Sequence, residues 1–438
     1  MKKILKITVI LLGYLTLPSP VLANTPETFG MGSRASAMGN AYTSVATGPF
    51  AFYYNPASSI FSPGVEIGFG SLVGIPRLAP IKNPVVLETA ETGDAKSVGQ
   101  VDVNYDSTIG AVFGLSLPLR KTYPRVGFGL TGYLPFDRFM SVHFEQPYLP
   151  TYPMYSNRTQ RFSFYSGAAV EVYPNVSVGG GVNVFTKMKG QTVLRASSSV
   201  PMAVLGVDVT PGISPVAGIQ YQTEKFGAGL TYRHEAKSTA KVAISPQLNN
   251  VMGANLGMDL LTAGTFFYDP SQFAAGVFYR VFDQLTIATD FVWARWSNFE
   301  LPYFDVDAKT PNLGETRIRG QFHNTLSPKV GLEYQLELLG DRLALRAGYQ
   351  FQPTPINDQQ PKNLNLLDAD KHVYSAGIGY GLDSFFGAIE TPVEIDLHAL
   401  LHQLKSREFI KASEEVGGPG YDVGGSLYSF GLSLTSHF

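Results

Sequence analysis

The chain ends on the sequence Tyr428-Ser429-Phe430-Gly431-Leu432-Ser433-Leu434-Thr435-Ser436-His437-Phe438. Tyrosine, phenylalanine and leucine alternate there with small or polar residues over most of the stretch. A period of two residues indicates a β-strand with one apolar and one polar face. About ten residues is also the length at which a tilted strand crosses a bilayer. The stretch therefore predicts a membrane-spanning strand, with an edge strand of a soluble β-sandwich as the alternative.

The first residues have the organisation of an export signal. Lysines near the N-terminus precede an apolar run over residues 7–17, and Ala23 follows two prolines. This order predicts a signal peptide over residues 1–23, with cleavage after Ala23. The apolar run is too short to span a membrane as a helix. The chain contains no cysteine, which excludes a lipoprotein anchor and disulfide chemistry.

Composition excludes other classes of protein. The formal net charge is −2, so no basic excess indicates binding to nucleic acid. Beyond the signal, no apolar run reaches the length of about 18 residues that a transmembrane helix requires. The chain nevertheless contains 45 glycines, 23 tyrosines and 29 phenylalanines among its 438 residues. Aromatic girdles and glycines within alternating strands are typical of a transmembrane β-barrel.

Alternation of this kind recurs along the chain. It predicts about fourteen strands, over residues 64–72, 108–117, 125–134, 162–172, 176–185, 212–221, 226–235, 273–281, 285–293, 328–336, 343–351, 372–380, 393–401 and 427–438. Their connections alternate between short ones, such as residues 173–175, and long ones, such as residues 236–272. Short periplasmic turns and long extracellular loops are typical of bacterial outer-membrane barrels. The prediction is an all-β protein, a transmembrane antiparallel β-barrel of about fourteen strands over residues 64–438.

The last strand also resembles the C-terminal strand of bacterial outer-membrane barrels, which ends on an aromatic residue. The resemblance implies insertion by the barrel assembly machinery, contact with outer-membrane lipid and lipopolysaccharide, and a multi-pass β-barrel in the bacterial outer membrane. A barrel of about fourteen strands is too wide for its own side chains to fill. Residues 24–63 are rich in glycine, alanine and serine and lack strand alternation, so we expect them to plug the lumen.

A more specific resemblance lies within this plug. Its residues are Gly30-Met31-Gly32-Ser33-Arg34-Ala35-Ser36-Ala37-Met38-Gly39-Asn40-Ala41 and Ala51-Phe52-Tyr53-Tyr54-Asn55-Pro56-Ala57. They resemble the N-terminal hatch of the FadL/TodX family of outer-membrane transporters for hydrophobic compounds, including its motif at Asn55, Pro56 and Ala57. Residues 291–297, 345–355 and 366–372 resemble later parts of the same family.

The family resemblance carries expectations about function. It implies a monomeric barrel, closed by a hatch, that takes up long-chain fatty acids or aromatic hydrocarbons passively. The hydrophobic molecule is captured by extracellular loops and bound in the lumen. It then leaves sideways, through movement of the hatch and a kink in the third strand.

Two segments are candidates for parts of this path. The third predicted strand carries Gly127, Gly129 and Gly132, which suit a kink but are equally usual in any barrel strand. Residues 250–267 form an unusually apolar extracellular loop. Its candidates for hydrophobic capture are Met252, Leu256, Met258, Leu260, Leu261, Phe266 and Phe267. Such residues either bind an apolar molecule or pack as a helix on the barrel rim.

Strand parity places charged side chains of both signs inside the barrel. Arg346, Arg233 and Lys329 are the candidates for holding the carboxylate of a ligand. The alternative is that the inward charges pair with one another and brace the barrel and the hatch. Arg34 is the candidate for a latch between the hatch and an inward carboxylate.

No enzymatic constellation emerges from the sequence. Nothing resembles a nucleophile motif, the histidines are too scattered for a metal site, and no cofactor motif is found. The interpretation is a transporter and not an enzyme. Two alternatives remain open: an open diffusion porin, and a non-transport barrel relative that acts as a docking component in protein secretion.

Overall fold

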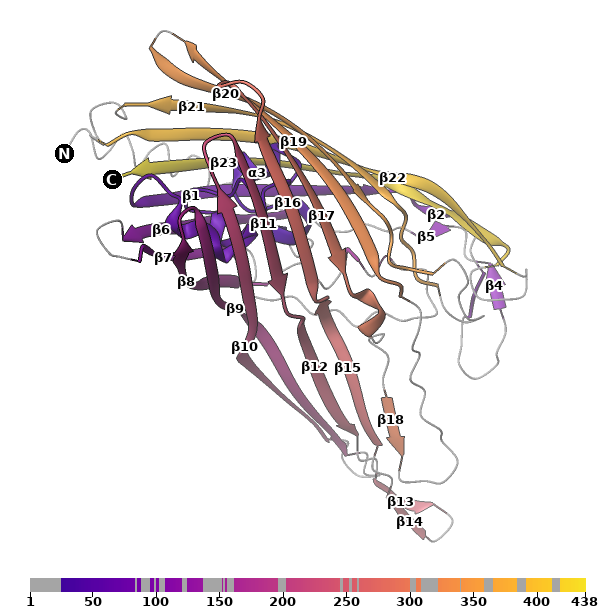
Figure 1. Cartoon of the computed structure of the whole chain (residues 1–438). Coiled ribbons are helices and arrows are strands. Elements are labelled where there is room, and N and C mark those ends of the chain that lie inside the picture. Colours follow the sequence, from indigo (N-terminus) through magenta and orange to yellow (C-terminus); the bar gives the residue numbers. More distant parts are fainter. Residues whose placement is uncertain are drawn as a thin grey trace, which may run out of the picture.

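The computed structural model describes residues 25–82, 85–87, 95–97, 100–101, 107–119, 124–136, 152, 154–155, 161–195, 202–244, 247–251, 254–257, 260–299, 305–308, 322–338, 340–357, 365–383, 391–411 and 418–438. The predicted signal peptide lies outside these residues. The chain forms a barrel of long strands with short helices inside it (Figure 1). In the described residues, none of the helices has the length and apolar character that a membrane crossing requires.

Fourteen strands form a closed antiparallel barrel. They are β1 (Glu66–Leu78), β6 (Thr108–Leu119), β7 (Val126–Pro135), β8 (Ser163–Tyr173), β9 (Val176–Arg195), β10 (Met202–Gln222), β11 (Phe226–Arg233), β16 (Gln272–Arg280), β17 (Leu285–Ala294), β19 (Thr325–Leu338), β20 (Asp341–Gln352), β21 (Lys371–Leu382), β22 (Val393–Ile410) and β23 (Gly420–His437). Each strand pairs with the next along the chain, and the last pairs with the first. Every predicted strand overlaps one of these, so the predicted fold class is confirmed.

The C-terminal stretch forms most of β23, and its pairing with β1 closes the barrel. The register runs from Glu66 opposite His437 to Leu78 opposite Gly425. Within β23, Phe430 is 49% exposed on the outside, whereas Ser429 and Ser433 are buried on the inside. The polar face thus lines the interior and the apolar face points outward. This arrangement excludes the soluble sandwich, whose core would be apolar.

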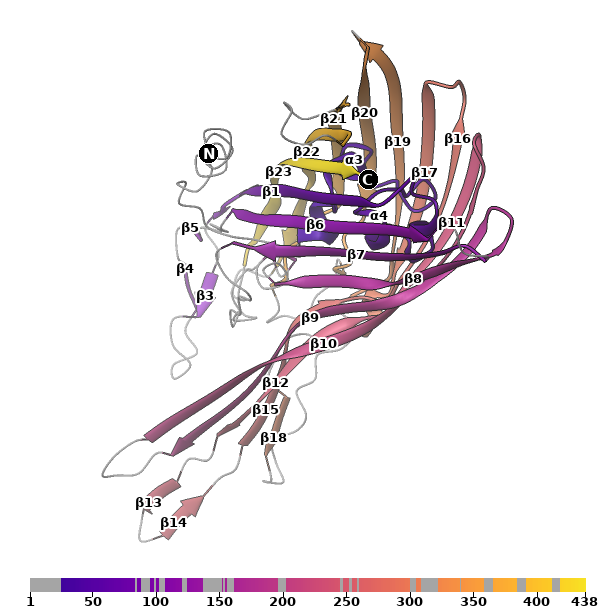
Figure 2. The same ribbon diagram turned by 90° about the vertical axis from the view of Figure 1, so that its left-hand side faces the viewer.

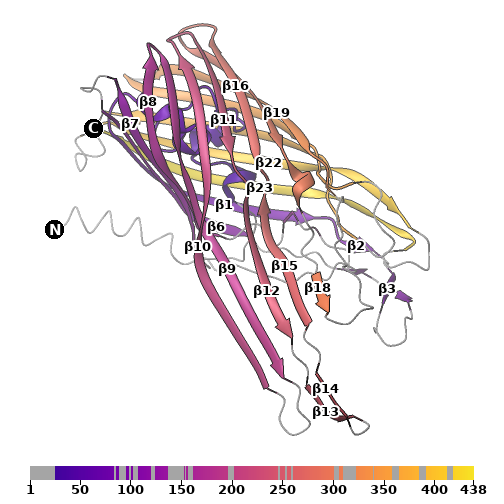
Figure 3. The ribbon, with the colours of Figure 1, turned by 60° about the horizontal axis from the view of Figure 1, so that its bottom comes forward.

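The two ends of the barrel differ. The turns between β8 and β9, β10 and β11, β16 and β17, and β19 and β20 lie at one end with the C-terminus, called here the turn end (Figures 1 and 2). The opposite end, where β1, β7 and β17 finish, is called here the loop end. At the loop end, β9 and β10 continue as a hairpin well past the predicted strand boundaries. A three-stranded sheet of β12 (Ala236–Ile244), β15 (Leu260–Asp269) and β18 (Asp305–Ala308) runs beside it, with β12 against β9 (Figure 3).

Short paired strands also occur outside the barrel. They are β13 (Gln247–Val251) with β14 (Ala254–Gly257), β2 (Ile81–Lys82) with β5 (Gln100–Val101), and β3 (Val85–Leu87) with β4 (Ala95–Ser97). A single 3-10 turn, η2 (Trp296–Asn298), follows β17 at the loop end.

Residues 25–63, called here the luminal segment, lie inside the barrel (Figure 2). The segment contains α2 (Thr25–Phe29), α3 (Ser33–Ala37), α4 (Ala51–Tyr54) and the 3-10 helix η1 (Pro56–Ile60). Helix α3 packs against β20 to β23, and η1 packs against β6 to β10, so the segment bridges opposite walls. Small residues of the wall allow this close approach. A Cβ added at Gly348 of β20, for example, would collide with the backbone of Met38 and Gly39 in the luminal segment.

Candidate functional site

Two cavities of the barrel interior lie beside the luminal segment, within the part of the chain that the structure describes. The outer cavity, of about 130 Å³, lies toward the loop end. The turn-side chamber, of about 720 Å³, lies toward the turn end and includes residues of the short turns. The outer cavity is lined by residues such as Tyr53, Tyr54, Met154, Trp296, Pro353, Pro355, Arg233 and Lys329. The turn-side chamber is lined by residues such as Arg34, Arg342, Arg346, Glu66, Glu394 and Asp396.

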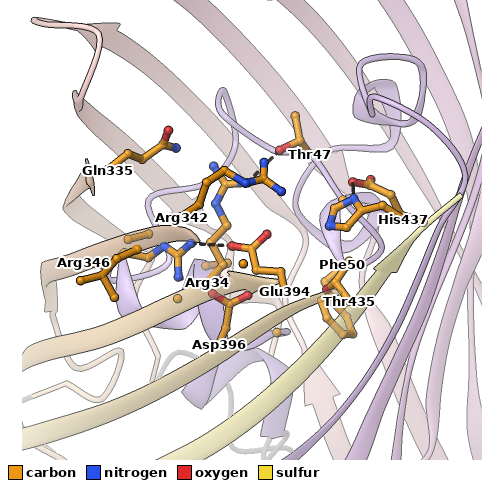
Figure 4. A pocket seen from close by; sticks show the side chains of 18 of the residues that line it. Arg34, Thr47, Phe50, Gln335, Arg342, Arg346, Glu394, Asp396, Thr435 and His437 are labelled. Carbon is orange, nitrogen blue, oxygen red and sulfur yellow. Dashed lines mark hydrogen bonds and ion pairs between the residues drawn. The ribbon is translucent and has the colours of Figure 1, made fainter. Parts of the chain in front are cut away.

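A charge cluster fills one side of the turn-side chamber (Figure 4). Arg34 of α3 donates from Nε and Nη2 to the two carboxylate oxygens of Glu333, each at 2.8 Å. Arg346 of β20 donates from Nε to the same carboxylate at 2.6 Å. The remaining nitrogens of Arg346 bind Glu394, at 3.0 Å, and Asp396. Three carboxylates therefore occupy the Arg346 guanidinium, and a bidentate pair ties the luminal segment to β19.

The contacts of this cluster bear on two hypotheses from the sequence: Arg34 as a latch and Arg346 as a ligand contact. Arg34 reaches an inward carboxylate, as the latch hypothesis expects. Burial works against the charge of Arg34, but the facing carboxylate of Glu333 outweighs it and raises the pKa of Arg34 above its ordinary value. For Arg346 the geometry favours the bracing alternative over a ligand contact, because its donors are already satisfied by protein carboxylates.

The outer cavity brings together the other two cationic candidates. Arg233 of β11 donates to the backbone oxygen of Tyr53 and lies 4.1 Å from the centre of that ring. Lys329 of β19 faces Asp290 across the strand register, yet within the described residues its ammonium makes no hydrogen bond and no ion pair. The Asp290 carboxylate instead accepts from the backbone N–H groups of Tyr42 and Thr43. Lys329 is therefore the cation most available to a ligand.

Sequence reasoning missed further residues of the outer cavity. Lys371 and Trp296 line it, together with Glu27, which accepts a 2.7 Å hydrogen bond from Gln272. Lys371 donates to Tyr155 Oη at 3.0 Å, so its ammonium is partly engaged. Lys371 and Trp296 lie within stretches that resemble the FadL/TodX family, which was an available signal. Glu27 belongs to residues 24–63, which the sequence predicts to lie in the lumen, but no local pattern indicates that its side chain lines a cavity.

The Asn55-Pro56-Ala57 motif attaches the luminal segment to β9 and β10. Asn55 Nδ2 donates to the backbone oxygens of Thr43, at 3.0 Å, and Ile219, at 3.1 Å. Its Oδ1 accepts from Ala57 N and caps η1, with Pro56 at the first helical position. Ser177 Oγ of β9 donates to Ala57 O at 2.7 Å. The motif thus acts as a fixed attachment between the segment and the wall.

The glycines of the third strand do not mark a kink. β7 pairs with β6 from Val126 to Pro135 and with β8 from Val126 to Tyr133, and neither ladder has a register shift. A Cβ at Gly127 would lie 2.7 Å from the backbone of Ser59 in the luminal segment. One at Gly129 would meet the Phe52 ring, and one at Gly132 would meet the Phe113 ring. These glycines are required by close approach and not by bending of the strand.

The predicted capture loop is partly a sheet. Met252 and Met258 lie outside the described residues. Leu256 belongs to β14, while Leu260, Leu261, Phe266 and Phe267 belong to β15, which pairs with β12 and β18. The backbone there is extended and not helical, so the alternative of a helix on the rim is wrong for these five residues. Capture of an apolar molecule by this segment stays a prediction.

Comparison with known proteins identifies the family. The sequence model of the outer membrane protein transport protein family (OMPP1/FadL/TodX) matches residues 27–397. Alkane uptake protein A of Marinobacter nauticus is 24% identical over 289 residues, which cover 62% of this chain and 62% of that protein. The alignment therefore spans less than two thirds of that relative's length.

Solved structures share the fold. A FadL homologue of Pseudomonas aeruginosa superposes with a TM-score of 0.59 at 17% identity, covering 96% of this chain and 99% of that one. The toluene transporter TodX of P. putida superposes with a TM-score of 0.54 at 16% identity, covering 94% and 99%. The members named in these comparisons are transporters and not enzymes. The chain belongs to the OMPP1/FadL/TodX family of outer-membrane transport proteins and is a β-barrel of the bacterial outer membrane.

Proposed function

We propose that the protein takes up hydrophobic molecules passively across the outer membrane and that the outer cavity is their binding site. The observation that carries this proposal is the lining of that cavity. Aromatic rings and prolines line one part of it, polar side chains such as Thr231, Gln272 and Gln350 line the rest, and cations lie at Arg233 and Lys329. A pocket that combines aromatic surface with placed polar groups suits a ligand that has both an apolar and a polar part. The turn-side chamber is larger, but its lining of paired charges suits water and not an apolar molecule.

The ligand chemistry that fits best is a long apolar tail with one anionic head, as in a long-chain fatty acid. The ammonium of Lys329 has no partner among the described residues, and Arg233 lies in the same cavity. A carboxylate placed between them would gain charge-assisted hydrogen bonds. The aromatic and proline surfaces would bury the part of the tail next to the head group, because a cavity of about 130 Å³ is smaller than the roughly 300–1,000 Å³ of sites that enclose a whole ligand.

A neutral hydrocarbon is the second candidate. It is favoured by the similarity to a relative named as an alkane uptake protein. The luminal segment weighs against a diffusion porin, because it packs against opposite walls of the barrel. The secretion-docking alternative predicts copurification with a secretion complex, which the transport proposal does not.

The test is binding and uptake of oleate and hexadecane, compared between the native chain and Lys329→Met. Loss of the ammonium should weaken oleate binding by about tenfold or more, since a hydrogen bond to a charged group contributes roughly 1.5–3 kcal/mol. Hexadecane binding should change little. Lys405→Met removes an exposed lysine of β22 and is the matched control. Equal losses for both ligands would show Lys329 to be structural, and no uptake of either ligand by the native chain would remove the proposal.

A further inference from the structure

We infer that the outer surface of β11, β16 and β17 binds one molecule of lipopolysaccharide, with its phosphorylated sugar in a pocket at the loop end and an acyl chain in a groove below. The inference goes beyond the proposed function, because this surface faces the membrane and not the lumen. The three strands are neighbours in the barrel (Figure 1). In a bacterial outer-membrane barrel the long loops face out of the cell, so the loop end of this wall lies in the outer leaflet.

The pocket has an aromatic floor. It is an external hollow of about 400 Å³, called here the head-group pocket, at the loop end of the three strands. Phe273 of β16 pairs with Tyr232 of β11 on one side and with Trp293 of β17 on the other. The ring centres of Phe273 and Tyr232 are 4.7 Å apart, and those of Phe273 and Trp293 are 5.9 Å apart. This aromatic row can bury the C–H face of a sugar ring away from water.

An unpaired cation lies beside the aromatic row. Arg295 directly follows β17 and lines the head-group pocket, and its N–H donates to Ser271 O at 2.9 Å. Within the described residues its exposed guanidinium makes no hydrogen bond and no ion pair. Glu235, a carboxylate in the lining, is already paired with Lys237 at 3.2 Å. A free guanidinium in this position suits a phosphate, which it can bind through two parallel hydrogen bonds.

Neutral polar groups complete the lining. The ring of His234 shares a hydrogen bond of 2.8 Å between its Nδ1 and Tyr232 Oη, which fixes its orientation. Ser271 and Asn298 also line the pocket. Hydroxyl, amide and imidazole groups can bond the hydroxyls of a sugar as well as the oxygens of a phosphate. Aromatic residues alone are usual at this level of a barrel wall, but a hollow that combines them with an unpaired cation indicates a site.

An apolar groove continues the pocket toward the middle of the membrane. It is a hollow of about 450 Å³, called here the acyl groove, over β10, β11, β16 and β17. Leu230, Ala275 and Phe291 form its first cross-strand row, two residues from the aromatic row. Rows spaced in this way lie about 7 Å apart. Leu230 is 56% exposed and Phe291 is 49% exposed, and the small side chain of Ala275 lies between them as the floor.

The next row extends the acyl groove. Ala228 pairs with Val277, and Val277 pairs with Thr289, so small side chains lie on both sides of Val277. Gly229 and Gly276, between the two rows, also line the groove. Lipid tails are as apolar as this wall, so van der Waals contact and not the hydrophobic effect selects a bound chain. A groove gives a flexible acyl chain more of these contacts than a smooth wall does.

The order of pocket and groove selects the lipid. The polar groups lie at the loop end, and the apolar groove runs from there toward the turn end. A lipid of the outer leaflet has its head and tails in this order, whereas a lipid of the periplasmic leaflet has the opposite order. Lipopolysaccharide is the outer-leaflet lipid whose head is a phosphorylated sugar. It therefore matches the aromatic row, the guanidinium of Arg295 and the groove together.

The experiment measures binding of lipid A, the lipid anchor of lipopolysaccharide, to the full chain in detergent. Native mass spectrometry counts the bound lipid over a range of lipid A concentrations. Arg295→Gln tests the head-group pocket, and Arg280→Gln makes the same change in the last residue of β16, at the turn end. Ala275→Leu tests the acyl groove, and Ala399→Leu is its control at an exposed position of β22. Dephosphorylated lipid A and phosphatidylglycerol are the comparison lipids.

We expect the native chain to bind one lipid A with saturation. Arg295→Gln should weaken this binding by about tenfold or more, because the charge-assisted hydrogen bonds to phosphate are lost. Dephosphorylated lipid A should bind the native chain and Arg295→Gln equally. Ala275→Leu should weaken the binding of both forms of lipid A, because the added side chain fills the groove. Arg280→Gln and Ala399→Leu should bind lipid A as the native chain does.

Three results would overturn the inference. They are equal binding of lipid A by Arg295→Gln and the native chain, binding of phosphatidylglycerol as tightly as lipid A, and a lipid-free dimer that Ala275→Leu abolishes. The last would show that this wall contacts a second copy of the chain. Oleate binding, measured on the same variants, should stay at the native level. A native chain that binds lipid A but neither oleate nor hexadecane would remove the proposed function and leave this site intact.

Discussion

Glu333 of β19 connects the barrel wall to the luminal segment. Its carboxylate accepts from Arg34 of the luminal segment and from Arg346 of the wall, and it is only 2% exposed. The desolvation of these charges is compensated by their mutual contacts, so removing one partner leaves the others poorly matched. We therefore expect Glu333 to hold the luminal segment in position and not to bind a ligand.

We predict that Glu333→Gln lowers the free energy of unfolding by about 2–3 kcal/mol, because Arg34 and Arg346 lose a shared negative charge. Urea unfolding of the purified barrel in lipid vesicles measures this. The control is Glu337→Gln, the same change at an exposed position of β19, which should stay within about 0.5 kcal/mol. Equal effects from the two variants would contradict the role assigned to Glu333.

At the scale of the element, β7 illustrates how glycines can be misread. Its glycine-rich sequence suits a bent strand, but its ladders are regular on both sides. The two inward glycines instead admit the backbone of η1 and the ring of Phe52. The strand is thus adapted to the luminal segment, and bending is not needed to explain its composition.

Gly127→Ala should lower the free energy of unfolding by about 1–3 kcal/mol, since the added methyl group would overlap the backbone of Ser59. Limited proteolysis should cut the luminal segment faster in this variant. Gly180→Ala, in β9, is the control, because its Cβ would have nothing closer than 3.7 Å. If Gly127 served only as a hinge, uptake would fall while stability and proteolysis stayed as in the native chain.

At the scale of the whole molecule, the luminal segment decides whether the barrel is a channel. A barrel of fourteen strands is wider than the eight-stranded barrels that side chains fill. The luminal segment occupies the interior and lies between the outer cavity and the turn-side chamber. The filled interior disfavours free passage of water and ions along the axis.

The full chain should therefore show no large steady conductance in a planar bilayer. Deletion of residues 25–63 should produce one, because the remaining barrel would enclose a water-filled lumen. The altered mobility of a folded barrel in unheated electrophoresis samples checks that the shortened protein has folded. A large steady conductance from the full chain would instead favour the diffusion porin.

The barrel could be predicted from sequence because each strand carries its own period of two. The loop-end boundaries of β9 and β10 could not be predicted in this way. Their backbone pairing continues past the membrane, where no lipid requires an apolar outer face and the period of two is lost. Parity correctly places Arg233, Lys329 and Arg346 inside. It cannot tell on which side of the luminal segment each one lies, because that depends on contacts between residues far apart in the chain.

The pairing of β1 with β23 also sets the order of events during folding. It joins residues 66 and 437, so the ring cannot close until nearly the whole chain has been synthesised. Contacts this distant in sequence form slowly. Until they form, β1 keeps an open edge that can pair with a strand of another molecule. The interval between synthesis of β1 and arrival of β23 is therefore the stage at which protection from mispairing matters most.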